Sequence, residues 1–262
     1  MKRNPLFWLS LGFLALLAAG AILAPWIAPY APNTSHDGFE KTSPSLQHLF
    51  GTDELGKDIF SRVLYGGRVS LLVGVAATFF SFLIGGFFGL LAGFFRGKVD
   101  LAIQFITDLT LSFPSLLLAM GITVVLNAGV PAIILSLSLV GWAPFARIVR
   151  GKVLELRERQ FVEAARSLGR SSWDILGLHV IPNLGPVLVV TSTLKIGGFI
   201  LSEAALSFLG LGPDPSVPTW GSMVYLGLDF IRYQPWIAFF PGLAIFLCVS
   251  GFNLLGEELQ KK

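Results

Sequence analysis

The amino-acid sequence predicts an all-α membrane protein with about six transmembrane helices and a cytoplasmic helical hairpin. Hydrophobic residues make up 53% of the 262 residues and charged residues only 13%, and the mean hydropathy is +0.72. Soluble proteins contain about 25% charged residues, so this composition excludes a soluble enzyme. Long uncharged segments also recur along the chain, and about 20 apolar residues are enough for a helix to cross a bilayer.

The first apolar segment has its core at residues 6–27, inside an uncharged stretch at residues 5–35. Prolines at the end of this core are expected to break the helix. Lys2 and Arg3 precede the segment, so a cleaved signal peptide is the alternative. The apolar core of a signal peptide has only about 7 to 15 residues. We therefore expect an uncleaved transmembrane anchor in residues 1–30.

Five further segments have the length and composition of membrane-spanning helices. The second and sixth spans carry no charge, the third contains Asp108, and the fifth contains Lys195 and Glu203. Pro144 is expected to kink the fourth. These five spans are residues 69–95, 101–126, 130–148, 184–208 and 235–256. The resulting organisation is an extracytoplasmic segment at residues 31–68, a membrane core at residues 69–256 and a tail at residues 257–262.

Lys and Arg are distributed unequally between the two sides of the membrane in this assignment. Thirteen of the nineteen lie on the side of the termini, five lie on the opposite side, and Lys195 lies in the fifth span. The acidic residues are divided evenly, with seven on each side. Because basic residues are retained in the cytoplasm, we expect both termini to be cytoplasmic. The loop at residues 150–183, between the fourth and fifth spans, is then cytoplasmic as well.

This cytoplasmic loop carries the pattern of a helical hairpin. Apolar residues in its first half follow helical spacing, and Gly169 is placed to end that helix. Ser171, followed three residues later by Asp174, resembles a capping box. The capping box predicts a second helix over residues 173–181, which Pro182 is expected to end.

The loop resembles a known transporter motif. Glu163-Ala164-Ala165, followed after three residues by Gly169 and later by Pro182, resembles the EAA loop in permease subunits of binding-protein-dependent ABC importers.

Two further segments narrow the resemblance. Residues 50–74 and residues 201–212, with the sequence PSVPTWG soon afterwards, closely resemble the second permease subunit of dipeptide and oligopeptide importers. The resemblance extends over most of the chain. Within the EAA loop, His179 and Ile181 stand where the family has Ile and Leu, which is a mild departure.

The resemblance implies that six residues of the loop couple the chain to ATP hydrolysis. In this family the EAA helix lies in a groove of a cytoplasmic ATPase subunit, and closure of two ATPases around ATP tilts the membrane helices. The alanines allow close approach, the glycine permits a sharp turn, and the glutamate offers an acceptor. The alternative is that these residues only shape a surface helix. The six are Glu163, Ala164, Ala165, Leu168, Gly169 and Pro182.

The resemblance also implies partners and cargo. The expected partners are a second, related permease subunit, two ATPase subunits that bind ATP and Mg²⁺, and an extracytoplasmic substrate-binding protein. We expect the chain itself to hold no cofactor and no ATPase site. We expect it to lie in a bacterial or archaeal plasma membrane. Di- and oligopeptides are the expected cargo, with nickel chelates, glutathione, a sugar oligomer or another small solute as alternatives. An ion-driven secondary transporter would instead predict inverted repeats, and the two halves of the sequence have no convincing similarity.

Residues 51–58, GTDELGKD, nearly match the phosphate-binding loop G-x-x-x-x-G-K-[ST]. The last position is Asp58 rather than the hydroxyl residue that contacts Mg²⁺, and Asp53 and Glu54 would repel phosphate. We therefore expect no nucleotide site at Lys57. The segment is expected to meet the binding protein or to cap the second span.

Metal, catalytic and nucleic-acid sites are not expected either. His36 and His48 are predicted on the opposite side of the membrane from His179, so the three cannot share one metal ion. No Ser, His and Asp arrangement or carboxylate pair at active-site spacing stands out in the spans. Basic residues form no nucleic-acid face outside the cytoplasmic loop.

Three ionisable residues lie in the predicted spans, where a charge is costly and normally turned away from lipid. Asp108 either faces the translocation path, or is an interfacial acid or one paired with a residue of the partner subunit. Glu203 is expected to have a structural or gating role. For Lys195 three interpretations stay open: it lines an aqueous path, contacts a substrate carboxylate, or extends to the membrane surface.

Overall fold

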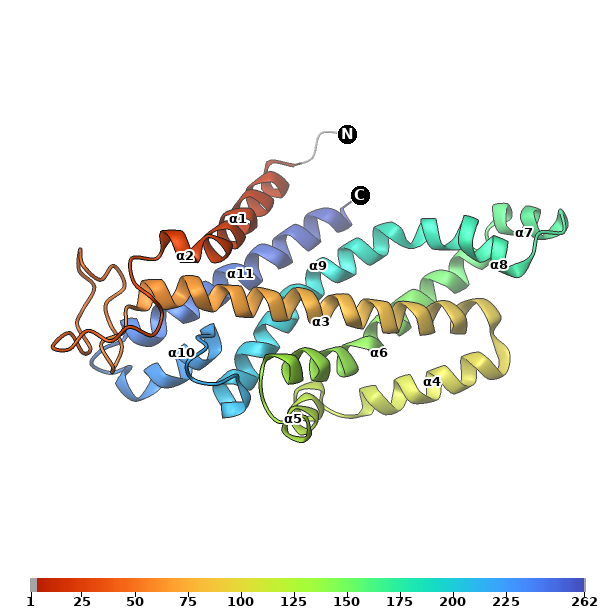
Figure 1. The fold of residues 1–262 in the computed structure, drawn as a ribbon. Helices are drawn as coiled ribbons and strands as arrows, with labels where there is room; N and C mark the ends of the chain where they lie inside the picture. The colour runs from red at the N-terminus through yellow and green to blue at the C-terminus, as the bar shows by residue number, and fades with distance from the viewer. Residues whose placement is uncertain (1–3, 262) are drawn as a thin grey trace.

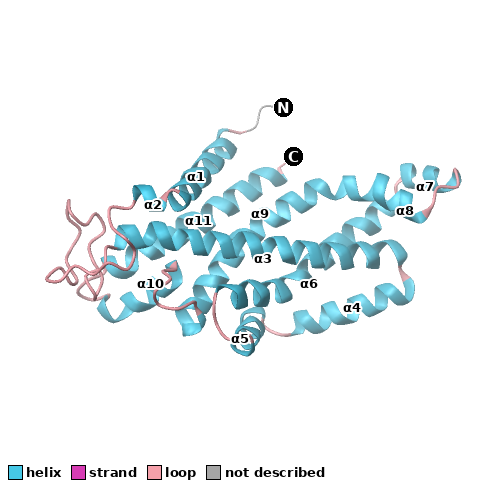
Figure 2. Ribbon diagram, in the orientation of Figure 1, coloured by secondary structure: helices cyan, strands magenta, loops and turns pink. Residues whose placement is uncertain are grey.

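The computed structural model describes residues 4–261, and every element named in this range is helical (Figures 1 and 2). An isolated bridge joins Thr52 and Asp58. Lys2, Arg3 and Lys262, which contribute to the predicted charge bias, lie outside the described residues. The all-α prediction is confirmed.

The elements follow one another along the chain in a simple order. They are α1 (Pro5–Ile22), α2 (Ala24–Ile27), α3 (Ile59–Phe95), α4 (Gly97–Ser112), α5 (Ser115–Val125), α6 (Val130–Arg157), α7 (Gln160–Ser167), α8 (Ser172–Ile175), η1 (Leu176–Val180), α9 (Ile181–Leu206), η2 (Ser207–Leu211), α10 (Trp220–Gly227), η3 (Leu228–Phe230) and α11 (Trp236–Gln260).

Within residues 4–261, five helices are long and apolar enough to cross a membrane. They are α1, α3, α6, the continuous helix Ser172–Leu211 and α11. The pair α4 and α5 makes a sixth crossing if its two bent halves are taken together. This agrees with the prediction of about six spans.

Helix α3 begins at Ile59, well before the predicted start of the second span at Val69. The predicted span is the uncharged part of this helix, and the helix itself also includes Arg62 and Arg68. Arg62 is only 2% exposed, and its Nη1 donates to the Pro32 carbonyl oxygen at 3.0 Å. Asp58 caps the helix, since its Oδ2 accepts a hydrogen bond from the Ser61 N–H at 2.8 Å.

The third predicted span, residues 101–126, is not one straight helix. It is divided into α4 and α5, which meet at 92°. Pro114 lacks an N–H and disfavours helical backbone in the residue before it, and Phe113 is extended at φ −90° and ψ 143°. The chain therefore turns by a right angle at this proline.

Helix α6 extends beyond the predicted end of the fourth span. It continues past Ile148 to Arg157, and Pro144 lies inside it. The hairpin that follows α6 is therefore joined to the membrane core by helix rather than by flexible chain.

The most extensive helix pair is α3 with α6, and glycines on α3 set their separation. A Cβ atom on Gly85 would lie 2.2 Å from the Trp142 carbonyl oxygen, and one on Gly89 would lie 2.5 Å from the Ala146 carbonyl oxygen. Gly93 continues the same four-residue spacing, which places all three on one face of the helix. Small residues at this spacing let membrane helices approach closely.

The two ends of the bundle carry different parts of the chain. Figure 1 shows the loop at residues 28–58 at one end and α7 with α8 at the other. Near the chain termini, Asn4 Nδ2 donates to Glu258 Oε2 at 3.2 Å. Both ends of the described chain therefore lie on the same side of the bundle, as an even number of spans requires.

Replacing Gly85 by Ala is expected to destabilise the protein by about 1–3 kcal/mol, a typical cost of overpacking. The added methyl group would collide with the backbone of α6. Gly86→Ala is the matched control, because a Cβ there would meet only Phe82 of the same helix, at 3.7 Å. The measurement is the temperature at which the chain in detergent loses monodispersity. Equal temperatures for the two variants would contradict the role of Gly85.

Candidate functional site

The hairpin formed by α7 and α8 is held to the membrane core by one face of α7. Val162 and Ala165 are buried in a cluster with side chains of α3, α6, α8, η1 and α9. The other face is open: Glu163 and Ala164 are exposed, and the Leu168 side chain is 84% exposed. The EAA residues therefore lie on a helix that packs against the membrane core with one face and leaves the other face accessible.

Gly169 ends α7 in a left-handed conformation, with φ of +76°. Its N–H donates to the Arg166 carbonyl oxygen at 3.0 Å, and the Arg170 N–H donates to the Ala165 carbonyl oxygen at 3.2 Å. These two bonds form a Schellman motif, which satisfies the last carbonyl groups of a helix and favours glycine at this position. The predicted helix stop at Gly169 is confirmed.

The second helix of the hairpin starts as predicted but does not end at Pro182. Ser171 Oγ accepts from the Asp174 N–H at 3.1 Å, which caps α8. The helix then passes through the π-helical turn η1 and continues directly into α9. A π-turn shifts the hydrogen-bond step from four residues to five, so a proline that follows it is accommodated within one helix. Ser172–Leu211 is thus continuous from hairpin to membrane core.

The hairpin also exposes two aromatic residues that the sequence analysis did not single out. Phe161 and Trp173 are both exposed, and the Trp173 ring lies 5.3 Å from the Phe95 ring at the end of α3. The sequence signal that could have identified these two residues is the presence of large apolar side chains among the polar residues of the hairpin. The two residues add exposed apolar surface to the hairpin.

Asp108 is paired with a neighbouring helix. Its Oδ1 lies 2.6 Å from Arg147 Nη2 on α6, and both side chains are exposed. One end of α4 is tied to the same helix by Asp100, whose two carboxylate oxygens accept from Arg150 Nε at 2.6 Å and Nη2 at 2.7 Å. Asp108 is therefore part of the contact between α4 and α6 and does not line the cavity described below.

Glu203 is fully buried between α9 and α3. Its Oε2 accepts from Ser70 Oγ at 2.8 Å, and its Oε1 accepts from Ser207 Oγ at 2.8 Å. Because both carboxylate oxygens are occupied, Glu203 ties α9 to α3 and is not available to a ligand.

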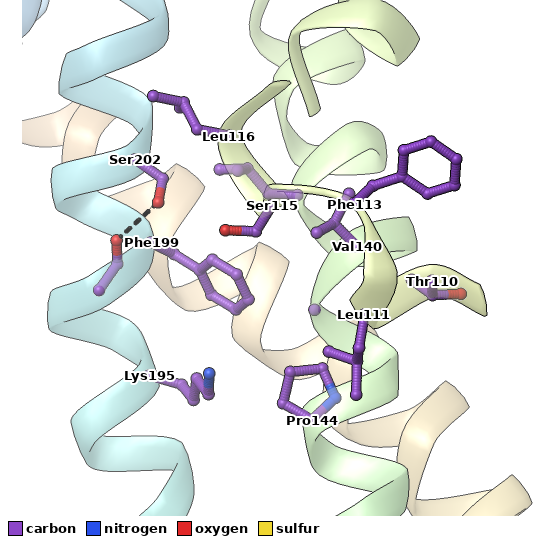
Figure 3. A pocket seen from close by; sticks show the side chains of 13 residues that line it. Thr110, Leu111, Phe113, Ser115, Leu116, Val140, Pro144, Lys195, Phe199 and Ser202 are labelled. Carbon is purple, nitrogen blue, oxygen red and sulfur yellow. Dashed lines mark hydrogen bonds between the residues drawn. The ribbon is translucent and has the colours of Figure 1, made fainter. Parts of the chain in front are cut away.

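Lys195 lines a cavity of about 360 Å³ (Figure 3). The bent α4–α5 pair, α6 and α9 line it, and Lys195 is the only charged side chain on its wall. No hydrogen bond or ion pair joins the Lys195 ammonium group to any described residue. The structure therefore separates the three ionisable residues: Asp108 is paired, Glu203 is buried, and Lys195 is open to a cavity.

The segment that resembles a phosphate loop binds its own carboxylate. Asp53 Oδ1 accepts from the N–H groups of Leu55 and Lys57, both at 2.9 Å. A phosphate loop uses such converging N–H groups for its ligand. Here they stabilise a turn that positions Asp58 to cap α3.

The structure brings together two of the three histidines. The rings of His36 and His48 lie 5.3 Å apart, and His48 Nδ1 lies 2.9 Å from Asp58 Oδ1. His179 is on η1, in the hairpin at the far end of the bundle (Figure 1). Among the described residues, no group of three or more His, Cys, Asp or Glu is placed to hold a metal ion.

Comparison with protein families gives two matches. Residues 85–262 match the family described as "Binding-protein-dependent transport system inner membrane component". Residues 1–46 match "N-terminal TM domain of oligopeptide transport permease C".

Individual proteins are also similar to this chain. It is 45% identical to the glutathione transport system permease protein GsiD of Escherichia coli O6:K15:H31 over 249 residues, which cover 95% of this chain and 82% of that protein. The GsiD protein of Shigella boydii serotype 4 matches equally well. An inward-facing structure of the MetNI methionine ABC transporter has the same fold, with a TM-score of 0.65 and 21% identity over 76% of this chain and 95% of that one.

Replacing Glu203 by Ala is expected to destabilise the fold by about 1–3 kcal/mol for each buried hydroxyl group left without its acceptor. Glu257→Ala removes an exposed glutamate and is the control. The measurement is the urea concentration that half-unfolds each variant in detergent. A Glu203→Ala chain as resistant as the control would show that the two serine contacts contribute nothing to stability.

Proposed function

This chain belongs to the family of inner membrane components of binding-protein-dependent transport systems and is a permease subunit of an ABC importer; we propose that it forms one half of a translocation path for short peptides. The proposed cargo includes dipeptides, oligopeptides and glutathione. Relatives with 45% identity are named for glutathione transport, and the N-terminal family match is named for oligopeptide transport. Glutathione is itself a tripeptide, so a single cargo class accounts for both names.

The continuous helix Ser172–Leu211 is the observation that carries the proposed mechanism. Its first turn forms the second helix of the hairpin, and its later turns line the cavity at Lys195. Movement of the hairpin is therefore transmitted to the cavity wall without a flexible joint. In this mechanism Glu163, Ala164, Ala165, Leu168 and Gly169 present the docking surface for a cytoplasmic ATPase, and Pro182 lies within the transmitting helix.

Other subunits supply ATP hydrolysis, the second half of the path and the delivery of cargo. Two ATPase subunits bind ATP and Mg²⁺ and hydrolyse the nucleotide, since the loop at Lys57 binds its own Asp53 carboxylate. A related permease subunit provides the second half of the path as a heterodimer. An extracytoplasmic binding protein delivers the cargo at the end of the bundle that carries the 28–58 loop. The complex lies in a bacterial or archaeal plasma membrane with both termini of this chain in the cytoplasm.

Single cysteines at the two ends of the bundle test this orientation. Cys248 is the only cysteine and is buried, so Cys248→Ser provides the background. Leu46→Cys, at a side chain that is 98% exposed, should react with a membrane-impermeant maleimide in intact cells. Arg170→Cys in the hairpin should react only after permeabilisation. Labelling of Arg170→Cys in intact cells would place the hairpin outside the cell and contradict the proposed topology.

Replacing Gly169 by Val tests coupling through the hairpin. Left-handed backbone costs an ordinary residue about 1–2 kcal/mol, and β-branched residues more, so the turn should be distorted. Uptake of radiolabelled glutathione or dipeptide and cargo-stimulated ATP hydrolysis should fall together, while the amount of assembled complex stays the same.

Two controls accompany Gly169→Val. Gly169→Asn should retain most transport, because Asn tolerates this conformation. Gly151 is also an exposed glycine with free space around it, but it lies inside α6 with helical backbone, so Gly151→Val should transport normally. Normal transport by an assembled Gly169→Val complex would remove the proposed coupling role of the turn.

A further inference from the structure

We propose that the cavity beside Lys195 binds a carboxylate group of the transported peptide, with Lys195 Nζ as its cationic partner. This inference rests on the proposed function of peptide import and adds a site within this chain that recognises the cargo directly. Its grounds are the size of the cavity, the unpaired charge of Lys195 and the chemistry of the surrounding wall.

The cavity is partly open, and the bend of 92° between α4 and α5 shapes one side of it. Phe113 and Ser115 at the bend form one wall, Val140 and Pro144 of α6 form a second, and α9 carries Lys195 on the third (Figure 3). A volume of about 360 Å³ is within the range of sites that hold small molecules, about 300–1,000 Å³. The space is therefore large enough for one end of a short peptide.

Lys195 has no counter-ion within the described chain. The two acids in the predicted spans are already occupied, since Asp108 pairs with Arg147 at 2.6 Å and Glu203, on the same helix as Lys195, accepts from two serines. Lysine is rarely buried unless it is paired, so a half-buried, unpaired ammonium group indicates that its partner comes from outside the chain.

The side chain of Lys195 does not run along its own helix. In Figure 3, it points from α9 to the side on which Pro144 lies. A lysine that reaches for the membrane surface would lie along the helix. Of the three interpretations that the sequence left open, contact with a carboxylate fits both this direction and the missing counter-ion.

The rest of the wall suits an anionic group attached to an apolar body. The Ser115 hydroxyl group makes no hydrogen bond with described residues and is free to donate. Ser115 is also the first residue of α5, whose N-cap, Pro114, supplies no side-chain cap. Phe113, Leu116 and Phe199 provide apolar surface.

A pair of alkylating reagents tests the site without any cargo. Gly198 lines the cavity one turn from Lys195, and a Cβ there meets nothing within 4 Å. In the complete transporter, with Cys248→Ser, Gly198→Cys is reacted with iodoacetate, which carries a carboxylate, and with neutral iodoacetamide. The ratio of the two rates cancels any change in thiol reactivity. Lys195→Met should lower the iodoacetate-to-iodoacetamide ratio about tenfold, and Lys195→Arg should preserve it.

A second cysteine and a second readout complete the test. The ratio at Leu46→Cys, outside the cavity, should not respond to Lys195→Met. In proteoliposomes, Lys195→Met should reduce uptake of radiolabelled glutathione about tenfold, whereas Lys98→Met, at an exposed lysine, should leave uptake unchanged.

The outcomes separate this inference from the proposed function. Uptake by the unaltered transporter tests peptide import, and the reagent ratio tests the cavity alone. A ratio at Gly198→Cys that is insensitive to Lys195→Met would overturn the carboxylate site. Undiminished glutathione uptake by Lys195→Met would overturn it as well, because the charge would then have no part in recognising cargo.

Discussion

The close contact between α3 and α6 is the constraint on which the other parts of the structure depend. Gly85 and Gly89 bring the two backbones together without intervening side chains. The ends of this pair nearest the hairpin supply Phe94, Val149 and Val153 to the cluster that holds the hairpin. Ser70 of α3 anchors α9 through Glu203, and α6 forms one wall of the cavity. Hairpin, cavity and α9 are thus all placed relative to one rigid pair of helices.

Polar contacts then fix the elements that apolar packing alone would leave free to rotate. Arg150 and Arg147 of α6 hold α4 through Asp100 and Asp108, which sets one wall of the cavity. The buried Glu203 holds α9 at the opposite wall. Apolar contact has little directionality, whereas these bonds require defined geometry. Lys195 is the exception, and its lack of a partner distinguishes a recognition group from these structural ones.

The sequence predicted the class, the approximate spans and the helix stop at Gly169, because composition, hydropathy and glycine at a helix end are local signals. It did not predict features that depend on tertiary contacts. Arg62 lies outside the predicted span, but buried hydrogen bonding lets α3 include it. Pro182 appeared to end a helix, but the preceding π-turn accommodates it.

The candidate site was predictable to a similar degree. Glu163, Ala164, Ala165 and Gly169 could be placed on a hairpin from spacing alone, with Leu168 beside them. The sequence could not show whether the side chains of Asp108, Lys195 and Glu203 are paired, buried or open to a cavity. Each outcome depends on which residue lies opposite on another helix. One side of the cavity is shaped by the right-angle bend at Pro114, and a proline in a sequence indicates a break without giving its angle.

The length of α3 has a consequence for the surrounding lipid. Its 37 residues span about 55 Å, whereas the hydrocarbon core of a bilayer is about 30 Å thick. Even the uncharged part, residues 69–95, is about 40 Å long. The helix therefore has more apolar length than an upright crossing needs, and tilting takes up the excess. Thinner and thicker bilayers can then be matched by a change of tilt, with the glycine contact to α6 kept intact, so hydrophobic mismatch is absorbed by the orientation of the bundle rather than by its internal packing.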